Sequence, residues 1–432
     1  MRPRKTLRSV SLIAVAAVTV ALAAASGSSA AGGSQVTLTL WHNYGTEGNA
    51  TATVNLVKAF EKLHPDIKIN VVSQPASNYF ALLQASQISH TGPDLAVMWT
   101  GLYDLKYQNL LVNLKPYFSA SAQSKLNGLN WTAPNFNLAK GFYVMPLENQ
   151  FYMGFYNKAV FKKAGISSPP QDWSQLYAAC SKLSKVGVAP IVYGADPQAI
   201  SSEPYPFYDL SYTMAGLYPP SQWGGLYSGK ISWTSPAIET QVGRWAALPK
   251  KGCTNSDVLT KTDILGAFMK GQAAMIIDGN WDTKTLQNGM GSKVAPFLPP
   301  FTSKPQTGVV QYSGDGFSVM KSSAHVKQAV EFLKFMMTPQ ASRIIAAAGL
   351  IPDIKGSTTS NPLSNEMLAF AAKDHKTPVP MIDNVIQTAV VTTGMKQLDA
   401  ALGGDISAAS ALGSMKSTLG SLPASQRGST YR

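Results

Sequence analysis

Hydrophobic and polar positions alternate near the N-terminal end of the chain. In Val36–Leu40 every second residue is apolar, which predicts a half-buried strand. Four apolar residues then recur at spacings of three from Val54 to Leu63, which predicts an amphipathic helix with Asn49 as its N-cap. Ile67–Val71 alternates again. A strand, a helix and a strand in succession predict a βαβ unit whose two strands are parallel.

Tryptophan follows three of the predicted strands. Trp41 comes directly after the first strand, and Trp99 follows Asp94–Met98, a short apolar run typical of a buried strand. Trp281 lies shortly after the predicted strand Ala273–Ile277. In open parallel sheets, ligands bind beyond the carboxyl ends of the strands. We therefore expect these three rings near a binding site.

The stretch Phe142–Tyr156 is long, apolar and aromatic, and it contains the polar run Glu148–Gln150. It has no helical spacing, so it predicts extended chain. Because it lies between an earlier and a later α/β region, we interpret it as a crossover from one lobe to another, with the polar run at the junction. Clefts between lobes are a common place for small-molecule sites.

The later chain predicts a second α/β region and two further crossings. The Pro-rich stretch Phe297–Pro305 is expected to return the chain to the first lobe, and Gly349–Pro352 to lead it back to the second. Ser313–Gly316 predicts a tight turn before a short strand. Helices are expected over Asn157–Ala164, Trp173–Lys185, Asp209–Gly216, Asp263–Lys270, Val326–Met337 and Gln340–Ala348, and then as far as Leu419.

Composition adds export and a basic surface to this picture. Four basic residues precede an apolar run from Val10 to Ala25, and small residues follow at Ser28–Ala30, which predicts a secretory signal peptide over residues 1–30. Taking these four charges from the formal +13 leaves +9 on the remainder. The lysines are spread thinly along the chain, which favours a solvated surface over nucleic-acid binding. Arginine is scarce, which disfavours a strongly anionic ligand.

Two cysteines, Cys180 and Cys253, both fall within the predicted second lobe. Exported proteins commonly form disulfides, but a sequence gives no distance between two thiols. A disulfide and two free thiols therefore both stay open. No cysteine follows the apolar run of the predicted signal, where a lipid would be attached.

Sequence motifs of catalysis or metal binding are not found. The five histidines are scattered without metal-ligand spacing, and there is no phosphate-loop lysine motif or nucleophile elbow, so no metal or cofactor is expected. Glu148, Glu203, Asp278 and Asp315 could in principle supply the acid and base pair of a glycan-active enzyme. Any secreted α/β protein carries as many carboxylates, so binding is favoured over catalysis.

Aromatic rings beside short polar side chains suit a carbohydrate. A sugar has apolar C–H faces that stack on flat rings, and a rim of hydroxyl groups that bond to Asp, Glu, Asn or Gln. The three strand-end tryptophans have such neighbours. Trp223, in the run QWGGLYSG, is expected either on a mobile surface loop or at a cleft edge. The other tryptophans considered are expected to be structural: Trp131, Trp173, Trp233 and Trp245.

Six segments resemble, in the same order, segments of the extracellular sugar-binding proteins of ABC importers, which are relatives of the maltose-binding protein. These segments are LTLWHNYGTEGN, FEKLHPDIKINVV, GPDLAVMW, MPLENQFYMGFYNKAVFKKAGISSPPQDW, FMKGQAAMIIDGNW and AVEFLKFMMTPQASRIIAAAGLIP. Together they extend over nearly the whole chain after the signal. The resemblance implies an α/β, two-lobed periplasmic-binding-protein fold of type II, with hinge crossings between the lobes and the ligand in the interlobe cleft.

The resemblance also implies most of the residues that contact the ligand, and the polar run at the junction adds Glu148 and Asn149. The predicted ligand-binding residues are Trp41, Asn43, Tyr44, Glu47, Trp99, Glu148, Asn149, Glu203, Tyr205, Asn280, Trp281, Gly314 and Asp315. The family's C-terminal cleft segment corresponds to Met381–Val385, which carries no tryptophan. This departure argues against a maltose-like ligand.

The resemblance also implies boundaries for the two lobes and a function. Lobe 1 is expected over residues 36–146 and 298–345, lobe 2 over 147–297 and 346–420, and a frayed tail over 421–432. The expected function is that of an exported, monomeric binding component of an ABC importer, which closes on an oligosaccharide and delivers it to the membrane permease. A receptor of the same fold for a glycerophosphodiester, a peptide or a polyamine stays open. So does a secreted glycan-active enzyme.

Overall fold

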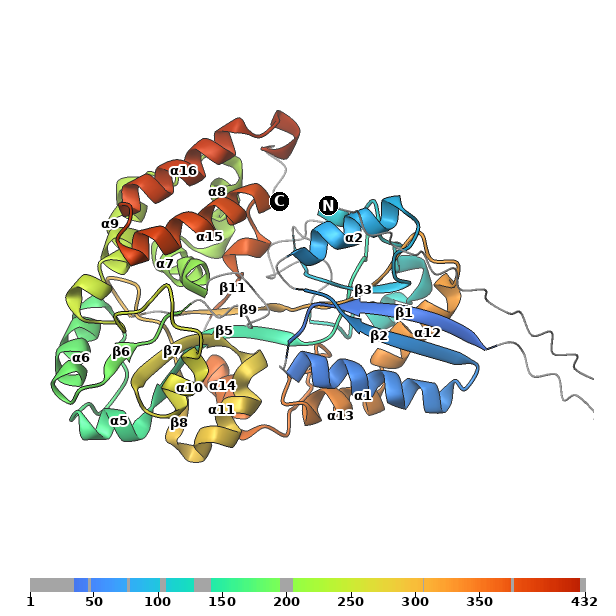
Figure 1. Ribbon diagram of the computed structural model, residues 1–432, viewed down its shortest axis with the longest axis horizontal. Coiled ribbons are helices and arrows are strands. Elements are labelled where there is room, and N and C mark those ends of the chain that lie inside the picture. The colour runs from blue at the N-terminus through green and yellow to red at the C-terminus, as the bar shows by residue number, and fades with distance from the viewer. Residues whose placement is uncertain are drawn as a thin grey trace, which may run out of the picture. The chain divides into compact units, whose positions relative to one another are not determined.

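A computed structural model describes residues 35–45, 48–75, 78–101, 106–127, 141–194, 205–305, 307–373 and 377–427. The predicted signal peptide, Trp131, Glu47 and Glu203 lie outside the described residues, as does the side chain of Tyr205. The described residues form two β-sheets, each with a hydrophobic core of its own (Figure 1).

The first sheet has five strands in the order β2-β1-β3-β10-β4. β1 pairs in parallel with β2 over its full length and also with β3, so the predicted βαβ unit is confirmed. β10 runs antiparallel between β3 and β4. The strands are Val36–His42 (β1), Ile67–Ser73 (β2), Leu95–Met98 (β3), Met145–Pro146 (β4) and Gly316–Val319 (β10).

Helices lie on both faces of the first sheet, with α2 on one side and α1 and α13 on the other (Figure 1). α1 packs against α12 and α13, and the core between them and the sheet includes Leu40, Phe317 and Phe332. These helices, with the short α4, are Gly48–Leu63 (α1), Tyr79–Ile88 (α2), Ala120–Gln123 (α4), Val326–Met336 (α12) and Pro339–Ala347 (α13).

The apolar stripe of α1 differs from the predicted one. Its buried face includes Leu56 and Phe60, whereas Val54 and Leu63 are 37% and 56% exposed. A strict spacing of three drifts around a helix with 3.6 residues per turn, so both ends of the predicted row rotate away from the core. The helix also begins at Gly48, which places Asn49 within the first turn and not at the N-cap.

The chain passes from the first sheet to the second at residues 147–148. β4 pairs with β10, whereas the next strand, β5 (Asn149–Asn157), is the middle strand of the second sheet. β5 has buried residues on both faces, since both are covered by other elements. The prediction of an extended crossover in Phe142–Tyr156 is thus confirmed.

The second sheet has the order β11-β9-β5-β7-β6, and β8 pairs with β5 off this path. β5 is antiparallel to β7, β8 and β9, while β6 is parallel to β7 and β11 to β9. The strands are Ala189–Ile191 (β6), Ala273–Gly279 (β7), Val294–Phe297 (β8), Gly308–Ser313 (β9) and Thr377–Val379 (β11).

Short polar side chains cap several helices around the second sheet. Asn157, Asp172 and Asp263 accept hydrogen bonds from the first-turn N–H groups of α5, α6 and α10. The helices are Lys158–Lys163 (α5), Trp173–Lys185 (α6), Leu210–Leu217 (α7), Gly224–Ser228 (α8), Pro236–Ala246 (α9), Ile264–Met269 (α10), Thr283–Met290 (α11), Pro362–Ala372 (α14), Thr388–Gly403 (α15) and Ala408–Ser421 (α16).

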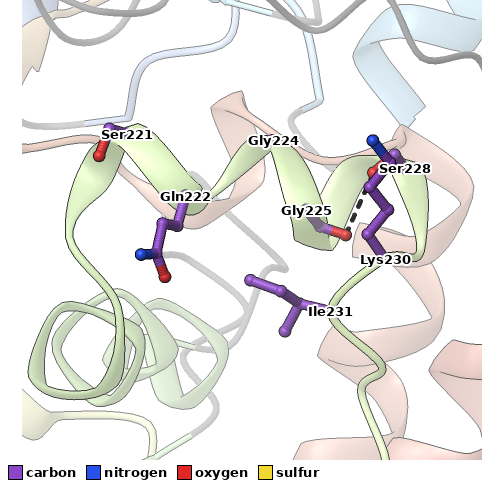
Figure 2. A pocket seen from close by; sticks show the side chains of 7 residues that line it. All are labelled: Ser221, Gln222, Gly224, Gly225, Ser228, Lys230 and Ile231. Atoms are coloured by element: carbon purple, nitrogen blue, oxygen red, sulfur yellow. Dashed lines mark hydrogen bonds between the residues drawn. The ribbon is translucent and has the colours of Figure 1, made fainter.

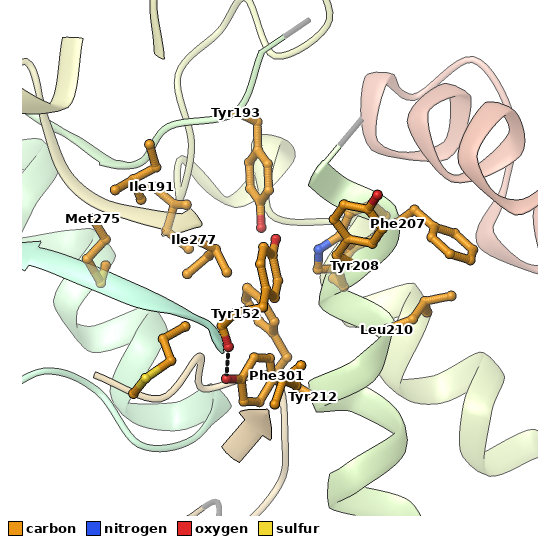
Figure 3. Packing of buried hydrophobic residues seen from close by; sticks show 14 of the residues in the cluster. Tyr152, Ile191, Tyr193, Phe207, Tyr208, Leu210, Tyr212, Met275, Ile277 and Phe301 are labelled. Atoms are coloured by element: carbon orange, nitrogen blue, oxygen red, sulfur yellow. Dashed lines mark hydrogen bonds between the residues drawn. The ribbon is translucent and has the colours of Figure 1, made fainter. Parts of the chain in front are cut away.

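A buried carboxylate ties together the aromatic core of the second sheet. Asp209, just before α7, accepts hydrogen bonds from the hydroxyls of Tyr193 (2.6 Å) and Tyr152 (3.2 Å) and from the indole of Trp245 (3.0 Å). Figure 3 shows the two tyrosine hydroxyls pointing toward each other. Burial raises the pKa of Asp209 to about 7, although the three hydrogen bonds act to lower it.

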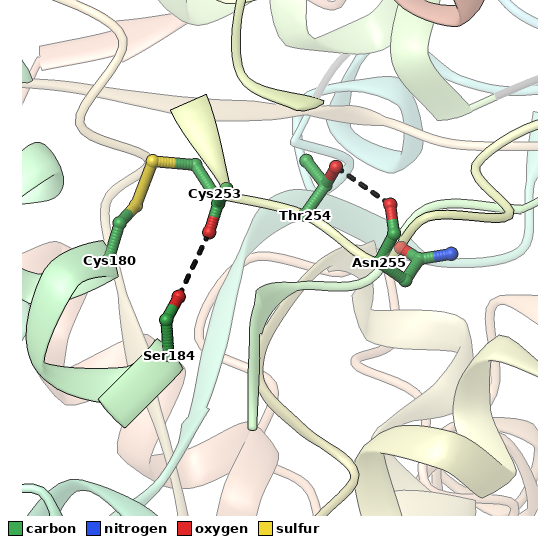
Figure 4. Close-up of a disulfide and its surroundings, with 6 residues drawn as sticks. Cys180, Ser184, Cys253, Thr254 and Asn255 are labelled. Carbon is green, nitrogen blue, oxygen red and sulfur yellow. Dashed lines mark hydrogen bonds between the residues drawn. A yellow bond between two sulfur atoms is a disulfide. The ribbon is translucent and has the colours of Figure 1, made fainter. Parts of the chain in front are cut away.

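A disulfide joins α6 to the edge of the second sheet (Figure 4). Cys180 and Cys253 are both buried, and their Cα atoms are 5.0 Å apart. The carbonyl of Cys253 accepts from the N–H of Ile191 (3.0 Å), so the segment after Cys253 runs beside β6. Of the two states left open by the sequence, the structure has the disulfide.

The return to the first sheet comes later than predicted. β8 and β9 both pair with β5, so the Pro-rich stretch between them stays with the second sheet. The chain crosses back at Gly314–Asp315, between β9 and β10. Prolines mark turns, but they do not determine which sheet the next strand joins.

The tryptophans expected to be structural and described here are buried: Trp173, Trp233 and Trp245. Trp223 is buried too, which corrects both alternatives considered for it. Its indole N–H donates to the carbonyl of Tyr218 (3.1 Å), so the side chain is part of the core. The glycines after Trp223 belong to the short helix α8 and not to a loose loop.

Candidate functional site

Two half-buried tryptophans lie at the carboxyl ends of neighbouring strands in the first sheet. Trp41 is near the end of β1, which continues two residues further than predicted, and Trp99 directly follows β3. The hydroxyl of Tyr79 donates to the carbonyl of Val97 (2.9 Å) and contacts that of Trp41 (3.2 Å), which anchors α2 to both strand ends. Phe80 meets Trp99 edge to face, with ring centroids 4.9 Å apart.

The segment after Trp41 is more deeply buried than a ligand-binding loop would suggest. Asn43 and Tyr44 are both 3% exposed, and the N–H of Tyr44 donates to Nδ1 of His42 (3.2 Å). Among the described residues, Oδ1 of Asn43 has no hydrogen-bond partner. Burial, followed by the charges of Asp315 and Glu148, raises the pKa of Tyr44 well above its usual range. Tyr44 therefore lies close to both carboxylates.

Glu148 is fully buried where the chain leaves the first sheet, and three amides surround its carboxylate. Oε1 accepts from Nδ2 of Asn49 (2.6 Å) and Nε2 of Gln150 (2.9 Å), and Oε2 accepts from Nδ2 of Asn280 (3.2 Å). Burial raises the pKa of Glu148 to about 7, and these hydrogen bonds partly offset the rise. The network connects α1, the crossover and the end of β7.

Asn280 and Trp281 follow β7 and have different surroundings. Asn280 is fully buried. Its Oδ1 accepts from the N–H of Phe151 (2.9 Å), and its Nδ2 also donates to the carbonyl of Asn149 (3.2 Å). Trp281 is half-buried, and its ring lies over Gly279, where an added Cβ would meet it at 2.1 Å. Only glycine leaves room for this ring position.

The pKa of Asp278, the carboxylate that bonds to the Trp281 side chain, is also shifted. Burial and the neighbouring Asp282 raise the pKa of Asp278 well above its usual range, while bonds from the Gly279 N–H and the Trp281 side chain oppose the shift. Asp278 is fully buried. The carboxylate of Asp278, at the end of β7, therefore helps to orient Trp281 by accepting a hydrogen bond from its side chain.

The three passages between the sheets, at residues 147–148, 314–315 and 349–353, are hydrogen-bonded to one another. The N–H of Gly314 donates to the carbonyl of Glu148 (2.8 Å), and the N–H of Asn149 donates to that of Ile351 (2.7 Å). The hydroxyl of Ser313 reaches both carboxylate oxygens of Asp353 (3.1 and 3.0 Å). A Cβ at Gly314 would meet the Gln150 side chain at 2.3 Å, so packing requires glycine there.

Sequence reasoning missed several polar residues at this junction. Burial, followed by Asp383, Asp315 and Glu148, raises the pKa of Tyr312 well above its usual range, which places its hydroxyl near three carboxylates. Asp383 is 5% exposed, and its Oδ1 has no partner. No local motif marks these residues, because strands and segments far apart in sequence bring them together. Asn49 was missed because its place before the helix suggested a cap.

The predicted ligand residues therefore fall into three groups. Trp41 and Trp99 pack against the core of the first sheet, and Trp281 against that of the second. Contacts or electrostatic influence join a polar set: Tyr44, Glu148, Asn149, Asn280, Gly314 and half-buried Asp315, with buried Asn43 next to Tyr44 in the chain. Glu47, Glu203 and the side chain of Tyr205 lie outside the described residues.

A shallow hollow lies away from these residues. It has a volume of about 400 Å³ on the helical turn Pro220–Gln222 and on α8 (Figure 2). Polar groups and one cation, Lys230, line it together with Ile231. None of the predicted ligand residues takes part.

Within the described part of the chain, no cluster of histidine, cysteine, aspartate or glutamate has the arrangement of a metal site. The same residues include no helix that is long and apolar enough to span a membrane.

Comparison with known proteins places this chain in a family. The family model for bacterial extracellular solute-binding proteins matches residues 44–343. The chain belongs to this family. The solute-binding protein is 25% identical over 305 residues to an uncharacterized ABC transporter extracellular-binding protein of Pyrococcus horikoshii. That match covers 66% of this chain and 65% of the relative, which is just under two thirds of the relative's length.

Two further similarities concern proteins with named ligands. The solute-binding protein is 21% identical over 343 residues to the multiple sugar-binding protein of Streptococcus mutans, covering 78% of this chain and 80% of that protein. The structure of a chitin oligosaccharide binding protein superposes with a TM-score of 0.75 at 21% identity, covering 89% of this chain and 98% of that one. The fold is thus the two-lobed periplasmic-binding-protein fold of type II that the sequence predicted.

Proposed function

We propose that this solute-binding protein binds a carbohydrate outside the cell, an oligosaccharide in the simplest case, and delivers it to the membrane permease of an ABC importer. The observation that carries the proposal is the chemistry at the ends of the strands. Half-buried Trp41, Trp99 and Trp281 each follow or end a strand, beside a buried set of amides and carboxylates. Relatives named for sugar binding support it.

This combination suits sugars for a physical reason. Indole rings offer flat apolar surfaces to the C–H faces of a pyranose, and carboxylate and amide groups bond to its hydroxyls. In the part of the chain that the structure describes, Oδ1 of Asn43 and of Asp383 are buried acceptors without a partner, which a ligand donor would satisfy if the lobes' movement exposes them. A micromolar dissociation constant corresponds to about 8 kcal/mol, which a few stacked rings and buried hydrogen bonds can supply.

Binding by hinge closure is part of the same proposal. The bonded passages at residues 147–148, 314–315 and 349–353 are the proposed hinge between two lobes. The first and third lie close to the boundaries expected from the sequence, and the second lies later in the chain. Strand pairing supports assigning residues 298–313 to the second lobe instead of the first. A ligand that contacts both lobes only when they close shifts the population toward the closed form.

No covalent step is needed for this role, so the protein is proposed to be a receptor and not an enzyme. Glu148, a junction carboxylate whose pKa is raised by burial, is fully buried and bonded to three amides. A general acid must reach the bond that it protonates, and a carboxylate enclosed in this way does not. We propose that the protein acts outside the cell as a monomer and without a cofactor.

The test is isothermal titration of the chain from Ala31 onward against mono- and oligosaccharides, with glycerophosphodiesters, a peptide mixture and a polyamine alongside. Saturable binding of one sugar class, with the sugar recovered unchanged, is the expected result. Binding of only a non-sugar solute would keep the fold and overturn the carbohydrate assignment. Recovery of a cleaved sugar would overturn the receptor role.

A further inference from the structure

Exposed lysines that are dispersed in the sequence lie on three neighbouring elements around the second sheet: α5, α6 and the turn after α9. Lys182 of α6 donates to the carbonyl of Gly165 (3.4 Å), directly after α5, and Ser184 of α6 donates to the carbonyl of Gly252 (3.2 Å). The Cys180–Cys253 disulfide fixes the same junction. The basic face consists of Lys158, Lys162 and Lys163 from α5, Lys182 and Lys185 from α6, and Lys250 and Lys251 from the turn after α9.

The positive charge of the basic face is not neutralised within the described chain. All seven lysines are exposed, and the four ion pairs among the described residues involve none of them. Lys251 lies over the ring of Tyr177, with its Nζ 4.9 Å from the centroid. Asp172 caps the opposite end of α6 from Lys182 and Lys185.

A hollow opens within the basic face. It has a volume of about 470 Å³, with Tyr156 and Phe161 at its apolar side and Lys158 and Lys162 beside them. Glu366 on α14 is the one carboxylate whose charge affects Tyr156 among the described residues, and it raises the pKa of that tyrosine. An anionic group entering the hollow would thus meet two lysines and one more distant carboxylate.

The residue types of the basic face distinguish between two kinds of anionic partner. Lysine is depleted from the centres of protein–protein interfaces, where aromatic side chains and arginine are enriched. All seven cations of the basic face are lysines, although the charge of Arg244 on α9 acts on Tyr177 beneath Lys251. None of the large hydrophobic side chains exposed in the described chain belongs to it. Lysines act as hydrated point charges that suit a diffuse layer of negative charge.

We propose that the basic face holds this protein against an anionic lipid surface by electrostatic attraction to the headgroups, independently of solute binding. Several lysines close to such a surface act together, and their attraction falls off within a Debye length. The proposal does not rest on the proposed sugar, because none of the predicted ligand residues belongs to the basic face.

The test is co-sedimentation of the chain from Ala31 onward with phosphatidylcholine vesicles, with and without phosphatidylglycerol. The test variant is Lys158→Gln/Lys162→Gln/Lys163→Gln. The control, Lys58→Gln/Lys62→Gln/Lys115→Gln, removes the same charge from exposed positions around the first sheet. We expect binding to anionic vesicles only, lost at about 1 M salt, where the Debye length is about 3 Å. The test variant should bind on the order of a hundredfold more weakly, at roughly fivefold per lysine.

Lysine acetylation provides a readout that needs no variant. With anionic vesicles present, the lysines of the basic face should be protected from an amine-reactive reagent, while Lys58, Lys62 and Lys115 should react as they do without vesicles. Three results would overturn the proposal: no binding to anionic vesicles, an equal loss in the control variant, or protection spread evenly over all lysines. Binding of the basic face to an acidic protein but not to vesicles would overturn it as well.

Discussion

Removal of the disulfide tests how the second sheet is held together. The perturbation is Cys180→Ala/Cys253→Ala, at two buried positions separated by 73 residues. For a closed loop of that length, the chain-entropy relation gives a stabilisation of about 4 kcal/mol at 25 °C, because the cross-link restricts the unfolded chain. Stabilities of whole domains are only about 5–15 kcal/mol, so we expect a large loss.

The assay is urea unfolding followed by far-ultraviolet circular dichroism, with and without reductant. Reduced wild type and the double variant both lack the cross-link, but only the variant lacks the two sulfur atoms, so their difference isolates lost packing. Oxidised wild type minus reduced wild type isolates the cross-link itself. A cross-link contribution below about 1 kcal/mol, or two free thiols titrated in the native protein, would refute the reasoning.

Three further predictions follow from single residues. Trp281→Ala should weaken the binding of the sugar found by titration ten-fold or more, since the ring would be lost as a stacking surface; an unchanged dissociation constant would take Trp281 out of the site. Gly279→Ala should weaken binding as well, because its Cβ would displace the Trp281 ring, and normal affinity with a raised or equal Tm would contradict that packing. The pKa of Asp209 is about 7 in the folded protein and 3.8 in the ordinary, unfolded case. Between these values the folded state binds a proton that the unfolded state has lost, so wild-type stability falls as the pH rises from about 4 to about 7. Asp209→Asn should make this fall shallower by up to about 1.4 kcal/mol per pH unit, and an unchanged slope in urea titrations would exclude Asp209 as its source.

Much of the fold could be predicted because its signals are local. Alternation identified β1 and β2, the local sequence pattern indicated α5, α6 and α10, and a polar run inside an apolar stretch identified the first passage between the sheets. The return passage was misplaced because β9 joins the second sheet through pairing with β5, and no residue in the Pro-rich stretch before it encodes that partner.

The candidate site was less predictable, because its polar set is assembled across long separations. Asn49, Glu148 and Asn280 meet in one hydrogen-bond network, although each lies in a different part of the chain. From the sequence, Asn49 resembled a helix cap and Tyr312 carried no signal, while Asp383 lay in a segment noted only for its lack of tryptophan. The strand-end tryptophans stood out because ring type and position coincide, and their role in the site stays a prediction.

The order of strands in the first sheet has a consequence for biosynthesis. β10 lies between β3 and β4, yet it is made long after both, since β3 ends at Met98 and β10 begins at Gly316. An emerging chain that stops at Ser313 therefore has a gap in this sheet, and closing so long a loop slows folding. This order suits the export that the predicted signal peptide implies, because the first sheet stays incomplete until most of the polypeptide has left the ribosome.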